Sequence, residues 1–183
     1  MRWFAILKRS MTERLRKAIV QAKQVKMKAA GVSVRPMRFS DFEFIRDLTV
    51  KIDGYTVPPL YVLWMLRRFH GEFCLIAEGP RKERLGYMLA MVTGIPSRRV
   101  FIWQFASTFH GQRVQTATSF ARHVHKLVKK HGIDELVFTA EPRSSGTRSI
   151  KRLSRLIFGC TPRAGSRLPK SISPREQEYH ILV

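Results

Sequence analysis

Acidic residues are scarce in this chain of 183 residues, because 13 aspartates and glutamates stand against 34 lysines and arginines, for a net charge of +21. Cysteines are scarcer still: Cys74 and Cys160 are the only two, and their spacing fits no metal-binding motif. Cys74 lies in an apolar stretch, which favours a buried free thiol, a reducing compartment and no disulfide. No apolar run approaches the ~20 residues of a membrane-spanning helix, and the apolar stretch 3–7 is too short for a signal peptide. We therefore expect a soluble, cytoplasmic protein without a transmembrane segment.

The surplus of positive charge indicates a polyanion as partner: DNA, RNA or a ribonucleoprotein. A basic surface that is merely solvated is the alternative interpretation. The charges cluster at the N-terminus and between residues 143 and 175, where nine basic residues occur without one acid. This pattern is typical of contact with phosphate backbones and contains no base-reading motif.

The N-terminal segment, residues 1–31, is expected to form a basic amphipathic helix. Ser10 and Glu13 have the spacing of a capping box. An apolar stripe at helical spacing follows, made of Met11, Leu15, Ala18, Ile19, Ala22 and Val25. Four roles stay open: packing on the domain, binding nucleic acid, contacting a membrane surface or partner, and organellar targeting.

The stretch 100–131 predicts a buried strand, a short turn and a helix. Residues 100–106 are apolar and rich in β-branched and aromatic side chains, which favours a strand. After the polar residues 107–112, one apolar stripe at helical spacing comprises Ala117, Phe120, Ala121, Val124, Leu127 and Val128. Such a unit directs the amides of a helix N-terminus at a phosphate group.

This unit resembles the cofactor loop of the GCN5-related N-acetyltransferase (GNAT) superfamily. In that family the fourth strand ends in an Arg/Gln-x-x-Gly-x-Gly/Ala turn that holds the pyrophosphate of acetyl-CoA. The corresponding residues, which the resemblance assigns to the cofactor, are His110, Gly111, Gln112, Arg113, Val114, Gln115 and Thr116. Arg113 and Gln115 stand at the two positions that are usually small, so their side chains either block the phosphate or bind it differently.

The resemblance covers roughly residues 32–158 and implies an α/β fold, a GNAT-like mixed central sheet flanked by helices, with the basic N-terminal helix as an addition. Residues 32–36 and 39–43 are similar to the opening strand and first helix, and Ser40 with Glu43 has the spacing of a capping box. Residues 73–78 and 85–90 are similar to a strand hairpin, and 101–106 to the fourth strand of diaminobutyrate acetyltransferases. The implied acyltransferase domain is 32–183.

Further elements follow from local signals in the sequence. A helix is expected over 60–69 after Pro58 and Pro59, and another over 147–156. Strands are expected at 134–139 and 178–183, with a Pro/Gly/Ser-rich segment before the last one.

Acetyl transfer needs a deprotonated amine, a polarised thioester carbonyl and a proton for the leaving thiolate. The resemblance places the carbonyl at backbone amides near Phe105, Ala106 and Ser107. It makes Glu78 and Glu141 the candidate bases. The proton-donating tyrosine of the family is absent from the last helix, which leaves Ser154 as the candidate there.

The loop 52–57 corresponds to the variable acceptor-binding connection of the family, so Asp53 and Tyr55 are candidate substrate contacts. No metal is expected, because His123 and His125 lie on different faces of their predicted helix.

The leading hypothesis is an acyl-CoA-dependent N-acetyltransferase acting on an amine, on or near nucleic acid or a ribonucleoprotein. One alternative is a catalytically silent protein of this fold that binds nucleic acid or an assembly. The other is a small-metabolite amine acetyltransferase. An enzyme is expected to have a V-shaped opening between the fourth and fifth strands.

Overall fold

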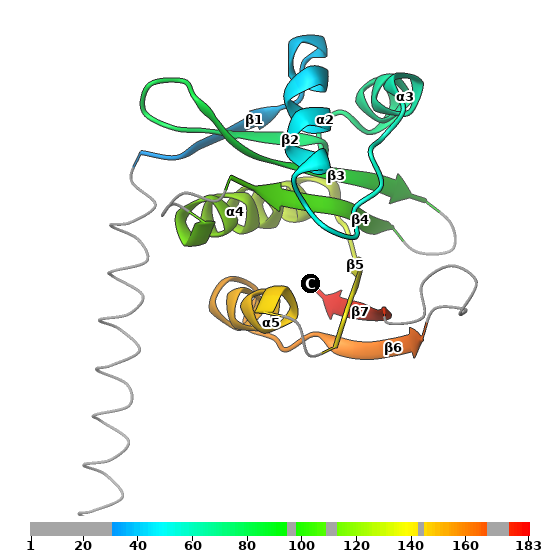
Figure 1. The fold of residues 1–183 in the computed structure, drawn as a ribbon. Coiled ribbons are helices and arrows are strands. Elements are labelled where there is room, and N and C mark those ends of the chain that lie inside the picture. Colours follow the sequence, from blue (N-terminus) through cyan, green and yellow to red (C-terminus); the bar gives the residue numbers. More distant parts are fainter. Residues whose placement is uncertain (1–30, 95–97, 109–112, 143–144, 168–175) are drawn as a thin grey trace, which may run out of the picture.

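We analysed a computed structural model of the chain, which describes residues 31–94, 98–108, 113–142, 145–167 and 176–183. The predicted N-terminal helix therefore lies outside the described residues. A seven-stranded sheet with the order β1-β2-β3-β4-β5-β7-β6 forms the centre (Figure 1). Its strands are β1 Ser33–Pro36, β2 Leu75–Glu78, β3 Arg84–Thr93, β4 Arg99–Ser107, β5 Glu135–Ala140, β6 Arg163–Arg167 and β7 Gln177–Leu182. The helices are η1 Phe39–Asp41, α2 Phe42–Val50, α3 Leu60–His70, α4 Arg113–His131 and α5 Ser145–Ile157.

The sheet is mixed, since β4 and β5 are parallel while the other neighbouring strands are antiparallel. Helix α4 makes the crossover between the two parallel strands, as a parallel connection requires. Helices α2 and α3 cover one face, and α4 and α5 lie on the other (Figure 1). Both faces are thus buried, which explains why β2 and much of β3 are continuous apolar runs rather than alternating ones.

Two apolar cores, one on each face, fix the helices to the sheet. Under α4, Phe120, Val124 and Val128 pack against residues of β2, β3 and β5. Under α2 and α3, Ile45 and Leu63 are fully buried against the opposite face. Of the apolar stripe that the sequence shows, Phe120, Val124 and Val128 are buried, and the other three residues are half-buried.

Most of the elements expected from the sequence are present within a few residues of their expected bounds. The predicted capping box of Ser40 and Glu43 is wrong, because Asp41 takes that place and its Oδ2 accepts the Arg38 amide at 2.7 Å. The Pro/Gly/Ser-rich segment contains a strand that the sequence did not predict, β6, whose partner is β7. Local patterns missed β6 because an edge strand that pairs on one side needs little apolar content.

Candidate functional site

An open strand edge forms the centre of the candidate site. Strand β4 pairs with β5 only from Arg99 to Ile102, opposite Glu135 to Phe138. The last two residues of β5 pair with β7 but not with β4, and residues 103–107 of β4 have no partner on β5. The two strands therefore part at this point, as a V-shaped opening between them requires.

A bulge in β4 lies where the two strands part. Leu89 pairs with Gln104 and Ala90 with Ile102, so Trp103 is the extra residue of the strand. Bulges bend a strand and increase its twist. The bend turns the last part of β4 away from β5 and leaves its backbone groups open.

The N-terminus of α4 lies at the far end of this open edge. The helix begins at Arg113, a few residues after β4 ends at Ser107. The amides of a first helical turn have no partner inside the helix, which makes them suitable for an anion. The hydroxyl of Thr118 donates to the Val114 carbonyl at 2.6 Å, within the helix itself.

The predicted cofactor residues divide between the helix and the loop before it. Arg113 and Val114 are exposed, Gln115 is half-buried and Thr116 is buried. His110, Gly111 and Gln112 lie outside the described residues. The long side chain of Arg113 is thus directed to the surface and does not bury itself in the end of the helix.

A glycine in β3 lets the helix and β4 approach each other. A Cβ atom on Gly86 would lie 2.5 Å from the Ala106 carbonyl oxygen and 3.2 Å from the Thr116 side chain. No real side chain tolerates the first distance, so only glycine allows this packing. The position of the α4 N-terminus relative to Ala106 depends on it.

The loop between α2 and α3 closes on the open edge from the other side. The Tyr55 hydroxyl donates a hydrogen bond to the Phe105 carbonyl at 2.9 Å. Next to it, the Gln104 amide donates to the Thr56 carbonyl at 2.8 Å, and Gln104 itself accepts from the buried Tyr87 hydroxyl. Two side-chain bonds thus attach the predicted acceptor loop to the predicted acyl-binding stretch of β4.

The Tyr55 hydroxyl is held in its protonated form. Burial raises its pKa above the ordinary value, the hydrogen bond to Phe105 opposes this in part, and the negative charge of Glu176 raises the pKa further. Glu176, which the sequence analysis did not select, therefore lies close enough to Tyr55 to act on it electrostatically. Its only signal in the sequence is its place as the first acid after a long basic segment.

Two acidic residues meet at the end of the β5–β7 ladder. Ala140 pairs with Gln177, so Glu141 and Glu176 occupy the next positions on the two strands. Glu141 is exposed, and its carboxylate makes no ion pair with the described residues. Asp53, the other acid predicted at the site, is likewise exposed on the acceptor loop.

Glu78 and Ser154 are not brought to the open edge. Glu78 lies on β2, two strands from β4, and its Oε1 accepts from the Arg35 Nε at 2.7 Å. Ser154 is 2% exposed, and its hydroxyl donates to the Ile150 carbonyl of its own helix at 2.9 Å. Both side chains already have structural partners.

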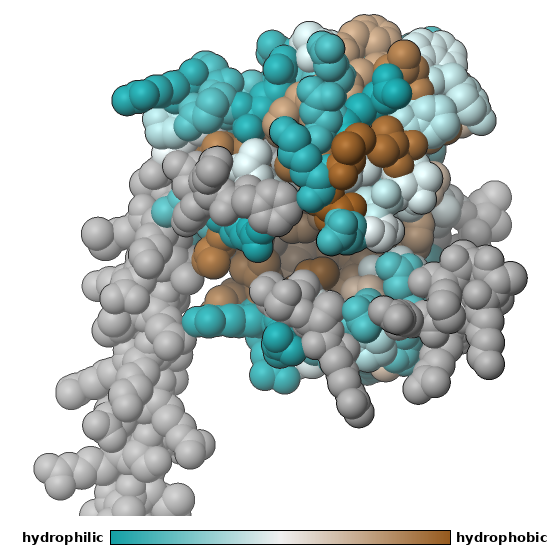
Figure 2. Space-filling view, in the orientation of Figure 1, coloured by the Kyte–Doolittle hydropathy of each residue, from teal (hydrophilic) through white to brown (hydrophobic). Residues whose placement is uncertain are grey.

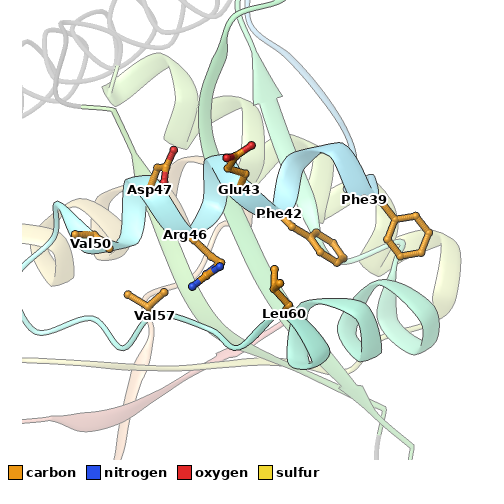
Figure 3. A pocket seen from close by; sticks show the side chains of 8 residues that line it. All are labelled: Phe39, Phe42, Glu43, Arg46, Asp47, Val50, Val57 and Leu60. Carbon is orange, nitrogen blue, oxygen red and sulfur yellow. The ribbon is translucent and has the colours of Figure 1, made fainter.

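A separate groove of about 520 Å³ lies between α2 and the start of α3 (Figure 3). Its apolar lining comes from Phe39, Phe42, Val50, Val57 and Leu60, and its charged lining from Glu43, Arg46 and Asp47. No residue of β4, β5 or α4 lines it. Figure 2 shows apolar surface in the recess at the middle of the molecule, between the half that contains α2 and α3 and the half that contains α5.

The described residues contain no group of three His, Cys, Asp or Glu side chains that could hold a metal ion. Cys74 is buried, and burial raises the pKa of its thiol to about 11. Within the described part of the chain, no helix combines the length and apolar character needed to cross a membrane.

The sequence matches no protein-family model and no curated protein. Solved structures do match the fold. Ard1 from Thermoplasma volcanium superimposes over 84% of this chain and 98% of its own, with 13% identity and a TM-score of 0.69. Diaminobutyrate acetyltransferase EctA from Paenibacillus lautus covers 82% of this chain and 94% of its own, with 18% identity and a TM-score of 0.63.

Naa50 from Arabidopsis thaliana is similar over 82% of this chain and 97% of its own length, with 14% identity and a TM-score of 0.64. These neighbours are GNAT acetyltransferases. The expected fold is therefore confirmed: the chain has the α/β fold of the GNAT superfamily, with its mixed sheet between helices.

Proposed function

We propose that this protein is an acyl-CoA-dependent N-acetyltransferase that acts on an amine. The open edge of β4, which leads from the α4 N-terminus to the point where β5 departs, carries the proposal. A helix N-terminus suits a pyrophosphate. An unpaired strand edge binds extended ligands that contain amide groups. Acetyl-CoA combines a pyrophosphate with an extended arm that contains amides.

The residues of the site fit this ligand. The first-turn amides of Arg113 to Thr116 would hold the pyrophosphate, and the exposed Arg113 guanidinium adds a positive charge there. The backbone of Phe105, Ala106 and Ser107 would hold the arm and the thioester carbonyl. EctA and Naa50 were solved with coenzyme A and a CoA-containing bisubstrate analogue, respectively, which supports the same ligand here.

The base that deprotonates the amine is Glu141 in this proposal. Its carboxylate is exposed directly after β5 and has no ion-pair partner among the described residues. Glu78 is a poorer candidate, because Arg35 binds its carboxylate and β3 separates it from β4. Ser154 is a poor proton source, since its hydrogen is used within α5.

The acceptor amine would enter between the α2–α3 loop and the end of the β5–β7 ladder. Asp53 and Tyr55 belong to the loop, and Glu141 and Glu176 belong to the ladder. Acidic groups on both sides favour an amine, which is cationic before it loses its proton. Such a grouping of acidic side chains stands out in this chain, which has only 13 aspartates and glutamates.

We further propose that the acceptor is part of, or bound to, a polyanion such as DNA, RNA or a ribonucleoprotein. Helices α4 and α5 contain nine lysines and arginines and no acid. They lie on the same face of the sheet, while α2 and α3 on the other face carry charges of both signs. One strongly basic face suits a phosphate backbone better than it suits a small metabolite.

Two other functions have weaker support. A silent binding protein of this fold requires the strand opening to be filled, whereas the described part of β4 has an open edge. A small-metabolite enzyme has the similarity to EctA in its favour, but the basic face would then be without a role. We place the protein in the cytoplasm, because the buried Cys74 thiol suits a reducing compartment.

Acetyl-CoA binding by calorimetry is the first test, at high salt so that nonspecific attraction between a +21 protein and an anionic ligand is screened. Saturable one-site binding is expected. Val114→Glu should weaken it at least ~10-fold, because a carboxylate beside the first-turn amides repels phosphate.

Val50→Glu is the matched control, since Val50 is 70% exposed and Val114 63%, and Val50 lies on α2. It should leave binding unchanged. Absence of one-site binding to the wild-type protein would refute the enzyme and favour the silent binding protein.

The acceptor class is tested by transfer from radiolabelled acetyl-CoA. Label in protein or RNA of purified ribonucleoprotein, with none in 2,4-diaminobutyrate, is expected. Label in the free diamine alone would support the small-metabolite enzyme instead.

A further inference from the structure

Tyr55 is the one tyrosine that reaches the open edge of β4. The chain has four tyrosines. Tyr61 is 65% exposed on α3, Tyr87 is buried in the core below α2, and Tyr179 stacks on Phe138 under α5. Among the four, only the Tyr55 hydroxyl makes a hydrogen bond to a backbone group of the unpaired part of β4, the Phe105 carbonyl, whereas the Tyr87 hydroxyl donates to the Gln104 side chain.

The loop holds Tyr55 in this place through bonds that do not involve its own ring. Gln104 binds the Thr56 carbonyl, and the Tyr87 hydroxyl lies 3.2 Å from Gln104 Oε1 and 2.7 Å from Thr49 Oγ1. This chain of buried polar groups ties the residue after Tyr55 to the bulged part of β4. The phenol is therefore presented to the edge by an ordered support.

No other described hydroxyl is available on α5 for proton transfer to the site. Ser154 is buried and bonded to Ile150, and Thr147 is buried with its hydroxyl on the Glu141 carbonyl at 2.7 Å. The described hydroxyls of α5 therefore do not supply the proton for the leaving group. The α2–α3 loop supplies a phenol at the edge.

We propose that Tyr55 is the proton donor to the departing thiolate, an inference that rests on the acetyltransferase function proposed above. The amine nitrogen forms a bond to the acetyl carbon while the carbon–sulfur bond breaks, and the electron pair of that bond stays on sulfur. The Tyr55 hydroxyl releases its hydrogen bond to Phe105 and gives its proton to the sulfur. The proton that the amine loses passes through Glu141 and water and restores the phenol, so the products are an N-acetyl amine and free CoA thiol.

The surroundings of the hydroxyl disfavour the phenolate, although Tyr55 is 38% exposed. Burial, together with the charge of Glu176, raises the Tyr55 pKa, so the phenol carries its proton at neutral pH. Among the described residues, the groups that interact with it are the Phe105 carbonyl, Glu176 and Tyr87, and none of these is a cation that would favour the phenolate.

The test compares Tyr55→Phe with Tyr61→Phe in the full chain. Calorimetry at high salt measures the affinity for CoA and for desulfo-CoA, which lacks the sulfur. Because a hydrogen bond to an ionised acceptor is strong, the wild-type protein should prefer CoA about 10-fold at an alkaline pH at which the CoA thiol is ionised. The preference should fall to about 1 in Tyr55→Phe and persist in Tyr61→Phe.

Turnover with the amine found in the acceptor screen gives a second measurement. Tyr55→Phe should lower kcat about 10²-fold with little change in KM for acetyl-CoA. Tyr61→Phe should behave like the wild type, and equal thermal unfolding midpoints would show that the fold is intact.

The possible failures can be told apart. If the wild-type protein binds and transfers but Tyr55→Phe keeps the preference for CoA and its kcat, the proton-donor role is refuted and the acetyltransferase stands. Tighter binding of both ligands by Tyr55→Phe would refute it too, because the tyrosine would then only cover the edge. If the wild-type protein does not bind CoA, both proposals fail.

Discussion

Glu78 and Glu141 occupy similar places in the sequence, since Glu78 ends a strand and Glu141 directly follows one, but their surroundings differ. Glu78 is 9% exposed and receives a hydrogen bond from Arg35, which also binds Asp41. Glu141 is exposed, and among the described residues only its backbone carbonyl has a hydrogen-bond partner, the Thr147 hydroxyl. The first carboxylate is therefore engaged in the fold, whereas the second is accessible, which is why we propose it as the base.

Glu141→Gln should consequently lower the catalytic rate, whereas Glu78→Gln should lower the stability of the fold. Glutamine at 141 cannot take a proton from the amine, so kcat should fall at least ~10²-fold while the unfolding midpoint stays the same. Glutamine at 78 leaves the Arg35 guanidinium partly unpaired, so stability should fall by about 1–2 kcal/mol with kcat largely kept. Steady-state kinetics and urea unfolding of both variants measure this. A normal kcat in Glu141→Gln would exclude Glu141 as the base.

At the scale of elements, one buried carboxylate joins three parts of the fold. Asp41 of η1 is fully buried and binds Arg35 of β1 at 2.7 Å and Arg84 of β3 at 2.8 Å. It also accepts the Arg38 amide before the helix. Strands β1 and β3 lie on either side of β2, so this cluster holds the start of α2 against the edge of the sheet.

Asp41 should make stability depend on pH in the acid range. Burial raises the pKa of its carboxyl, but hydrogen bonds from Arg35 and Arg38 outweigh this and hold the pKa below the ordinary value. A lowered folded-state pKa adds stability that is complete above the unfolded-state pKa of about 4 and is lost as pH falls through the folded-state pKa.

Asp41→Asn should therefore be less stable than the wild type by about 3 kcal/mol at pH 7, because it leaves two arginines without their buried partner. The difference should shrink steadily below about pH 4, where the wild-type carboxyl becomes protonated. Urea unfolding at a series of pH values measures it. A difference that is constant with pH would show that the charge of Asp41 is not what stabilises the cluster.

For the whole molecule, the distribution of charge matters more than its total. Among the described α-helices, all acids lie on α2, whereas α4 and α5 are purely basic. The acids near the open edge of β4 come instead from a loop and from strand ends. The fold thus separates a basic face from this acidic region, so in the proposed function a polyanion and an amine would not compete for one surface.

Charge reversal on the two faces should separate specific binding from general attraction. Lys126→Glu with Arg152→Glu alters the α4–α5 face, and Lys51→Glu with Arg68→Glu alters the other face by the same charge; all four side chains are exposed. The first pair should weaken binding to duplex RNA at least ~10-fold and flatten its salt dependence, because phosphate contacts are lost. The second pair should have a much smaller effect in the same fluorescence anisotropy titration. Equal losses would mean that net charge alone drives the binding.

The sequence by itself determined the local elements and the fold class. Apolar stripes and runs identified α4, β4 and β5, and Pro58 with Pro59 marked the start of α3, because these signals depend on neighbours within one or two turns. The motif order also identified the fold. The resemblance named Phe105 and Tyr55 as site residues, and the structure brings these two residues together.

Only the tertiary structure decided how these residues meet. Tyr55 and Phe105 are 50 residues apart, and their hydrogen bond exists because a bulge opens β4 and Gln104 holds the loop. Packing of distant segments also brings Glu176 close to Tyr55 and pairs Glu78 with Arg35. The bond from Ser154 to Ile150, in contrast, lies within one helical turn. Long-range packing sets which polar groups find partners when they are buried, and no local pattern records that choice.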